Sequence, residues 1–317
     1  MQKSPFKLYD FLGYAFPGAL VLLGILVTWD LSSLQSNDVI QLRQIVESAI
    51  KIFKTADWCN MAIFVFFAYM IGHLVSYMSS MTVEKIAILL YGYPSEFLMG
   101  QADDPLQNYK NGKVGDKQSI AIFLVYIFMS PLIVCELVFG YCLGVRQYLL
   151  KPVDENLRAT INDKITKLID KLQLTIDLDE NMSAKSDFHS IVHHYVYSRG
   201  HNGFSKLDNY VALYGFNRAI CFVLDLGFIV LAIMMISGIV ESSAILLFTL
   251  VILCYVFFMS FMKFYRRYSL ENFMELIVDT SLTKDSESQI SISYLNQHIV
   301  DTSTIYHQSK STQTDNN

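Results

Sequence analysis

The stretch AICFVLDLGFIVLAIMMISGIVESSAILLFTLVILCYVFFMSFM, residues 219–262, decides the class of this protein. It contains only two charged residues, Asp225 and Glu241, and Glu241 lies where two apolar runs meet. Each run holds about 20 residues, which as an α-helix matches the roughly 30 Å hydrocarbon core of a bilayer. Because the link is so short, the stretch predicts two antiparallel transmembrane helices at 219–240 and 242–262.

The composition of the whole chain is also typical of a membrane protein. Charged residues make up 17% of the 317 residues and hydrophobic residues 53%, whereas ordinary soluble domains carry about 25% charge. Three further apolar runs cover about 11–29, 58–83 and 119–145. We therefore predict an all-α, polytopic membrane protein with four to five transmembrane helices plus a cytoplasmic helical segment.

The polar stretches between the runs predict the domain organisation. Residues 1–145 form the N-terminal membrane region, and 146–218 form the cytoplasmic segment, where apolar residues recur three or four positions apart. Residues 219–282 form the hairpin with a helical extension. The tail, 283–317, is rich in Ser, Thr, Asn and Gln and is expected to be disordered. Residues 30–57 predict an amphipathic helix.

Basic residues set the expected orientation. Lys263, Arg266 and Arg267 follow the last run, whereas the link between the final two runs has no Lys or Arg. Because cytoplasmic flanks are enriched in basic residues, we expect this link outside and the C-terminus in the cytoplasm. The run at 119–145 either spans or is re-entrant. With five crossings 18 of the 24 Lys and Arg residues lie inside, and with four crossings 21 do.

Three ionisable side chains lie within the predicted membrane runs: Glu136, Asp225 and His73. A charged carboxylate at the bilayer centre costs roughly 2.5–3.5 kcal/mol, so each acid must be protonated, paired or facing water. One hypothesis is a polar pathway along the helix bundle. The other is interhelical hydrogen bonding that fixes the packing, which is favoured because each site is single.

Small residues recur every four positions in two runs and predict close helix contacts. They are Ala68, Gly72, Ser76 and Ser80 in one run, and Gly140 and Gly144 in the other. Small side chains let helix backbones approach each other in a membrane. The contacts could form within the chain or between copies, so a homo-oligomer is expected. Glu136 shares the face of the two glycines.

The cytoplasmic mouth of the fourth run carries a second pattern. Tyr210, Tyr214 and Arg218 are spaced four apart, and Lys263, Arg266 and Arg267 follow the fifth run. One interpretation is the interfacial belt of tyrosine and basic residues. The sharper interpretation is a clamp that joins the cytoplasmic segment to the bundle.

Signals for catalysis are few. His189, His193 and His194 stand in an H-x3-HH spacing that resembles one histidine box of the membrane desaturases. That family uses several boxes, and the seven histidines of this chain form no second one. His189 and His193 are weak metal candidates because they would share a helix face. No Walker, GxGxxG, HExxH or GxSxG motif occurs, so we expect neither enzymatic activity nor a cofactor.

Four motifs carry a resemblance to a known group of proteins. They are YDFLGYAFPGALVLL (9–23), YMIGHLVSYMSS (69–80), GYPSEFL (92–98) and LYGFNRAI (213–220). They resemble small uncharacterised bacterial multi-span membrane proteins, some of which are encoded beside anti-phage defence genes. The resemblance covers about half the chain and transfers no functional residue. It implies a membrane-acting effector or accessory protein of the bacterial inner membrane.

The leading functional hypothesis is a non-enzymatic membrane effector or signalling subunit. It would associate with copies of itself and alter membrane permeability in response to a cytoplasmic protein partner. The alternative is a small transporter or channel that uses Glu136, Asp225 and His73, and the third hypothesis is a membrane-bound metalloenzyme. The net charge of −5 argues against a nucleic-acid partner.

Overall fold

The computed structural model describes residues 11–33, 40–54, 57–100, 123, 125–174, 186–198, 204–241 and 243–279. Every regular element within these residues is a helix, and the single extended contact is a bridge between Ile40 and Val240. Four helical segments are long and apolar enough to cross a membrane. The predicted all-α class is therefore confirmed. The predicted disordered tail, 283–317, lies outside the described residues.

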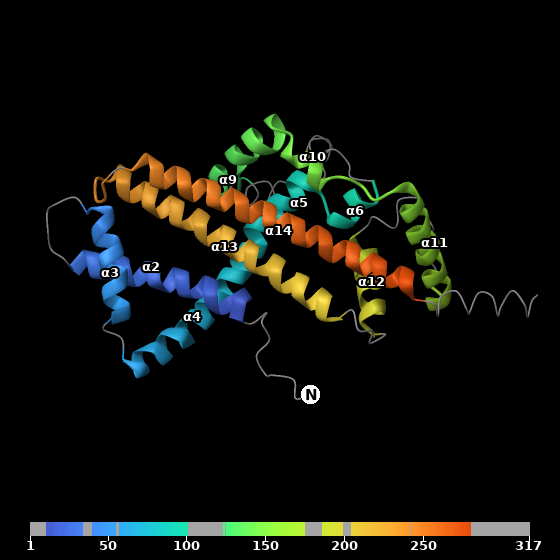
Figure 1. The fold of residues 1–317 in the computed structure, drawn as a ribbon, viewed down its shortest axis with the longest axis horizontal. Helices are drawn as coiled ribbons and strands as arrows, with labels where there is room; N and C mark the ends of the chain where they lie inside the picture. The colour runs from blue at the N-terminus through green and yellow to red at the C-terminus, as the bar shows by residue number, and fades with distance from the viewer. Residues whose placement is uncertain are drawn as a thin grey trace, which may run out of the picture.

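A helical hairpin forms the long axis of the molecule. It consists of α13 (Phe204–Ile236) and α14 (Ala244–Val278), which lie side by side along the longest dimension (Figure 1). At 33 and 35 residues, each helix is about 50 Å long and exceeds the roughly 30 Å hydrocarbon core. The apolar runs start at the hairpin turn, so both helices extend about 20 Å beyond the bilayer at the other end. Gly238, with a φ of 70°, closes the turn.

The N-terminal region adds two more helical segments to the hairpin. Their elements are η1 (Phe11–Ala15), α2 (Phe16–Ser33), α3 (Leu42–Lys54), α4 (Trp58–Ser79), η2 (Ser80–Glu84) and α5 (Lys85–Tyr91). At the start of α2, the Phe16 ring lies 5.8 Å from the Phe216 ring of α13. Just after α2, Ile40 bridges the hairpin turn at Val240. The start of α2 and the end of α14 therefore lie on the same side of the apolar slab.

The helices α2 and α4 cross at a contact between backbones. A Cβ added at Gly18 would overlap the Ala68 backbone, and one added at Gly72 would overlap the Tyr14 backbone. Only glycine allows this approach at both positions. Ala68 and Gly72 thus lie at a contact within the chain, of the kind that small residues permit in membranes.

The buried stripe of α4 differs from the predicted one in its second half. It consists of Ala68, Gly72, Val75 and Ser79. Ser76 and Ser80 are only half-buried, and the Ser80 hydroxyl bonds back to the Tyr77 carbonyl. The physical reason is the helical repeat of about 3.6 residues, which drifts away from a strict spacing of four.

The described part of the apolar run at 119–145 contains a short apolar helical stretch, Ser130–Cys142, which follows helical residues 125–128. It consists of α9 (Ser130–Cys135) and the π-helix η3 (Glu136–Cys142), of 6 and 7 residues, and is followed by α10 (Val145–Leu149). The Met129 N–H donates to the Val125 carbonyl, which joins α9 to the helical residues before it. In Figure 1 this segment arches away from α14 and returns at α10. Among the described residues, four segments are long and apolar enough to cross a membrane, and this apolar arch is not one of them.

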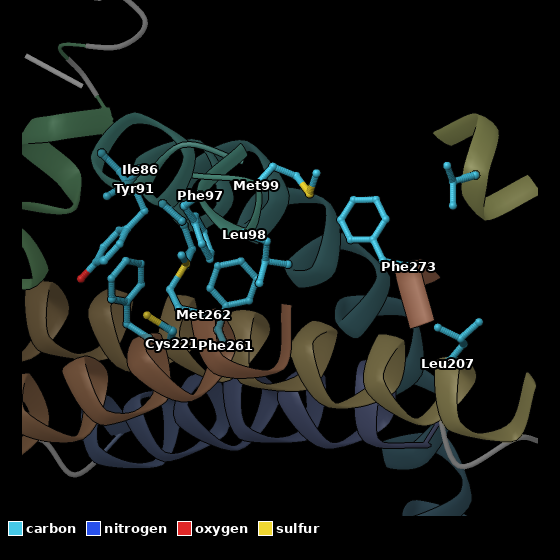
Figure 2. Packing of buried hydrophobic residues seen from close by; sticks show 14 of the residues in the cluster. Ile86, Tyr91, Phe97, Leu98, Met99, Leu207, Cys221, Phe261, Met262 and Phe273 are labelled. Atoms are coloured by element: carbon cyan, nitrogen blue, oxygen red, sulfur yellow. The ribbon is translucent and has the colours of Figure 1, made fainter. Parts of the chain in front are cut away.

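A core of buried apolar side chains, of the kind found in water-soluble proteins, surrounds the part of α14 that lies away from the hairpin turn. Here α6 (Pro94–Leu98), α11 (Glu155–Leu172) and α12 (Ser186–Ser198) pack around the helix. Figure 2 shows Leu98 next to Phe261 of α14, and all four of Leu98, Met99, Phe261 and Met262 belong to the buried apolar cluster. The boundary predicted at residue 218 falls inside α13, which passes through it without a break.

Candidate functional site

The end of the bundle that is predicted to be its cytoplasmic mouth is held by an ion pair and an aromatic cluster. Arg218 of α13 pairs with Glu84 at the end of η2, and its side chain is only 13% exposed. One turn earlier, the Tyr214 ring lies 5.3 Å from that of Tyr265 and 5.6 Å from that of Tyr268. These contacts join α4, α13 and α14 at the level where the apolar runs end.

The other predicted residues of the mouth have different surroundings. Arg266 donates a 2.7 Å hydrogen bond to the Lys151 carbonyl, which ties α14 to the segment before α11. Lys263 and Arg267 are exposed, and Tyr210 is half-buried. Tyr214, Arg218 and Arg266 thus contact protein, and both the clamp and the belt interpretations stay predictions.

The junction at the end of α14 joins three helices. Lys164 of α11 donates a 2.9 Å bond to the Asp279 carbonyl, and the Tyr195 hydroxyl of α12 donates a 2.8 Å bond to the Asp279 carboxylate. Nearby, His193 Nδ1 lies 3.1 Å from the Asn272 side-chain oxygen. Lys164, Tyr195 and Asp279 are all buried. Since each buried polar group has a partner, the junction holds α11 and α12 in a defined position.

The histidines of α12 pack against α14. The His189 ring makes edge contacts with Tyr268 and Phe273, at 5.9 and 5.6 Å. Burial, with a smaller contribution from His193, lowers the pKa of His189 to about 4, so this ring is neutral at pH 7. His194 is exposed. Within the described ranges, no group of three or more His, Cys, Asp or Glu side chains could hold a metal ion.

Glu136 lies under the apolar arch, buried against α5 and α14. The hydroxyl groups of Tyr91 and Tyr255 are close enough to interact with its carboxylate, although among the described residues neither reaches strict hydrogen-bond geometry with a carboxylate oxygen. A Cβ at Gly140 would overlap this carboxylate, and Gly144 has a left-handed φ of 72°. The predicted pairing of Gly140 and Gly144 at a helix contact is therefore wrong. Gly140 accommodates the side chain of Glu136, and Gly144 ends the π-helix.

Asp225 lies in the interface between α13 and α14. It is fully buried, and both of its carboxylate oxygens lack a partner in the part of the chain that the structure describes. One turn earlier, the Cys221 sulfur lies 3.6 Å from the Cys254 sulfur of α14. The surroundings of this carboxyl group are thus apolar or weakly polar.

His73 occupies a third place, at the crossing of α2 and α4. Its ring stacks on Tyr14 at 4.1 Å and meets the edge of Tyr69 at 4.6 Å. No contact between any two of Glu136, Asp225 and His73 is present in the described residues. The described residues therefore show no continuous line of polar groups that would connect these three side chains into a pathway.

The fold defines the class of this protein: an all-α protein with four helical segments able to cross a membrane. No protein-family model, curated protein or solved structure matches the chain.

Sequence reasoning missed the partners that complete the mouth and the junction, among them Glu84, Lys164, Asn272 and Asp279. Arg218 and Glu84 are 134 positions apart, and Lys164 and Asp279 are 115 apart. No local pattern connects residues at such separations. The only available signal was for Glu84, a charged residue placed directly after an apolar run.

Proposed function

We propose that this chain is a non-enzymatic signalling or effector subunit of the bacterial inner membrane. A protein partner would bind the helical module formed by α11 and α12 and change the packing, and so the permeability, of the bundle. The observation that carries this proposal is the continuity of α13 and α14 from the apolar slab into the module, where Asp279 binds both α11 and α12.

The coupling between the module and the bundle depends on two sets of contacts made by the same hairpin. The Asp279 junction attaches the module to the end of α14, and the Arg218–Glu84 pair attaches α4 to α13 at the membrane boundary. A helix transmits displacement along its axis because its backbone hydrogen bonds keep it rigid. A partner that prefers one arrangement of the module would therefore bias the arrangement of α4 against α13.

The orientation follows from charge. The start of α2 and the end of α14 lie on the same side, which is what four crossings require. In that topology 21 of the 24 Lys and Arg residues lie on the side of the module. The positive-inside rule then supports a cytoplasmic module and a cytoplasmic C-terminus.

The experiment breaks the Asp279 junction by substitution, in the absence of any partner protein. Tyr195→Phe combined with Lys164→Met removes both donors to Asp279, and Thr160→Ala, on the exposed face of α11, is the matched control. Membrane potential is measured with a voltage-sensitive dye in cells, and dye leakage in proteoliposomes. We expect the wild type and the control to be tight and the released variant to depolarise and leak.

Two outcomes would contradict the proposal. A released variant that elutes like the wild type, retains its helicity and stays impermeable would remove the coupling. A wild type that moves a solute constitutively, and loses this flux in Glu136→Gln or Asp225→Asn, would establish the transporter alternative instead.

A further inference from the structure

The amphipathic helix α3 lies at the end of the molecule that carries the hairpin turn. Just before it, the backbone of Ile40 exchanges hydrogen bonds with that of Ile239 and Glu241, both 2.9 Å long. Within the helix, Lys51 forms a 3.0 Å ion pair with Asp30 of α2. Both contacts place α3 where two spanning helices leave the apolar slab.

A tryptophan stands near each end of the segment that contains α3. Trp29 lies one turn before the end of α2 and is 77% exposed, and Trp58 is the first residue of α4 and is 93% exposed. Tryptophan gathers at the headgroup level of bilayers because its ring is amphipathic. The two exposed rings therefore favour a position of α3 close to the membrane surface.

The exposed surface of α3 is divided into an apolar flank and a polar flank. One side of the helix packs on the protein, where Ser48 is buried and Ile45 is half-buried. Beside that side, Val46 and Ile50 are 52% and 48% exposed. They are one turn apart and share a face, so they form a continuous apolar strip.

The polar flank follows further round the helix. It carries Arg43 and Glu47, which form an exposed ion pair of 2.7 Å. The order around the axis is thus protein, apolar strip, then charged strip. A helix lying in the surface of a bilayer beside a spanning helix requires this order, with acyl chains below it and water above it.

We propose that α3 is an interfacial helix, with Val46 and Ile50 inserted among the lipids of the leaflet at the hairpin-turn end. The occupant of the apolar strip is the acyl-chain boundary of the bilayer itself. The position of α3 carries this assignment, because its contacts at Ile40 and Lys51 hold it at the hairpin turn and beside Asp30, next to the exposed Trp29 of α2. Lys51 and Arg43 have acidic partners within the chain, which leaves Lys54 to meet headgroups, so the contact depends mainly on apolar burial.

The test measures the depth of single nitroxide labels in lipid nanodiscs. The exposed native cysteines are first removed by Cys59→Ser and Cys142→Ala. Labels are then attached in the variants Val46→Cys and Ile50→Cys on the apolar strip, and in Glu47→Cys, further round the helix, as the matched control. The preparation without an added cysteine is the blank. Collision with oxygen and with a water-soluble nickel chelate reports the depth.

We expect the labels at 46 and 50 to collide at least several-fold more with oxygen than with nickel, relative to the label at 47. The result should be the same in zwitterionic and in anionic nanodiscs. As a second measurement on the unmodified chain, lipids brominated near the headgroup should quench Trp29 and Trp58 more than lipids brominated deep in the acyl chains.

Two results would overturn the proposal. Equal access of nickel to the labels at 46, 50 and 47 would place the apolar strip in water. Low access of both reagents at 46 and 50, with dipolar broadening between labels, would mean that a second copy of the chain covers the strip. Neither result depends on the signalling role, because the depth of α3 is measured without any partner.

Discussion

The two ends of the hairpin contain the same two helices but bury their side chains in opposite ways. At the turn, Ile236, Ile245 and Phe248 are exposed on the protein surface. At the far end, Phe273 and Leu276 are fully buried, and Lys164 and Tyr195 donate hydrogen bonds to Asp279. The difference shows where the solvent changes: the turn end needs lipid to cover it, whereas the far end has a core that water would accept.

Phenylalanine truncation should give the largest contrast between the two ends. Phe273→Ala removes a fully buried ring and should cost about 3–5 kcal/mol of stability in the module. Phe248→Ala, at the turn, should change stability in detergent by less than about 0.5 kcal/mol. Hydrogen exchange on α11 and α12 measures both. Equal protection in the two variants would mean that the module is not held by this core.

Acid should weaken only the far end. Folding lowers the pKa of His189 to about 4, from an ordinary value near 6.5, so the unfolded module binds the extra proton. The contribution of the neutral ring is complete above pH 6.5 and is lost as the pH falls toward 4, amounting to up to ~3 kcal/mol. The free energy of unfolding of the module should fall between pH 7 and pH 4 in the wild type. This dependence on pH should be absent in His189→Phe. An unchanged slope in that variant would assign the proton to another group.

The ion pairs at the two ends should differ in strength. Arg218→Met leaves Glu84 without its partner at a mostly buried site and should cost about 1.5–3 kcal/mol. Lys51→Met at the turn end breaks an exposed pair and should cost at most about 1 kcal/mol. Thermal unfolding in detergent, with Glu84→Gln to complete a double-mutant cycle, measures the coupling. Similar losses at both ends would remove the contrast.

The glycine contact between α2 and α4 lies between the two ends of the hairpin. Disrupting it should give the smallest of these losses of stability. Gly72→Ala forces its Cβ against the Tyr14 backbone and should cost about 1–3 kcal/mol. The matched control is Gly24→Ala on α2, where nothing lies within 4 Å, and it should stabilise the helix by up to about 1 kcal/mol. Thermal unfolding of both variants is the measurement. A tolerated Gly72→Ala would show that the two helices can separate freely.

Sequence reasoning succeeded where one local pattern was sufficient and failed where the partner was distant. The amphipathic helix in 30–57 and the apolar hairpin follow from periodicity and length. The pairing of Gly140 with Gly144 failed because the π-helix moves Glu136 over Gly140. The extent of the arch could not be predicted either, since an apolar run of membrane length can break as well as span.

The sequence by itself determined that this chain is an all-α membrane protein with a tight terminal hairpin, because apolar length and charge placement act locally along the chain. Only the tertiary structure decided which polar groups meet. Asp279 binds Lys164 and Tyr195, Arg218 binds Glu84, and Asp225 and Glu136 stay apart. These outcomes depend on how helices far apart in the chain approach each other, and that packing is decided by the whole set of buried surfaces at once.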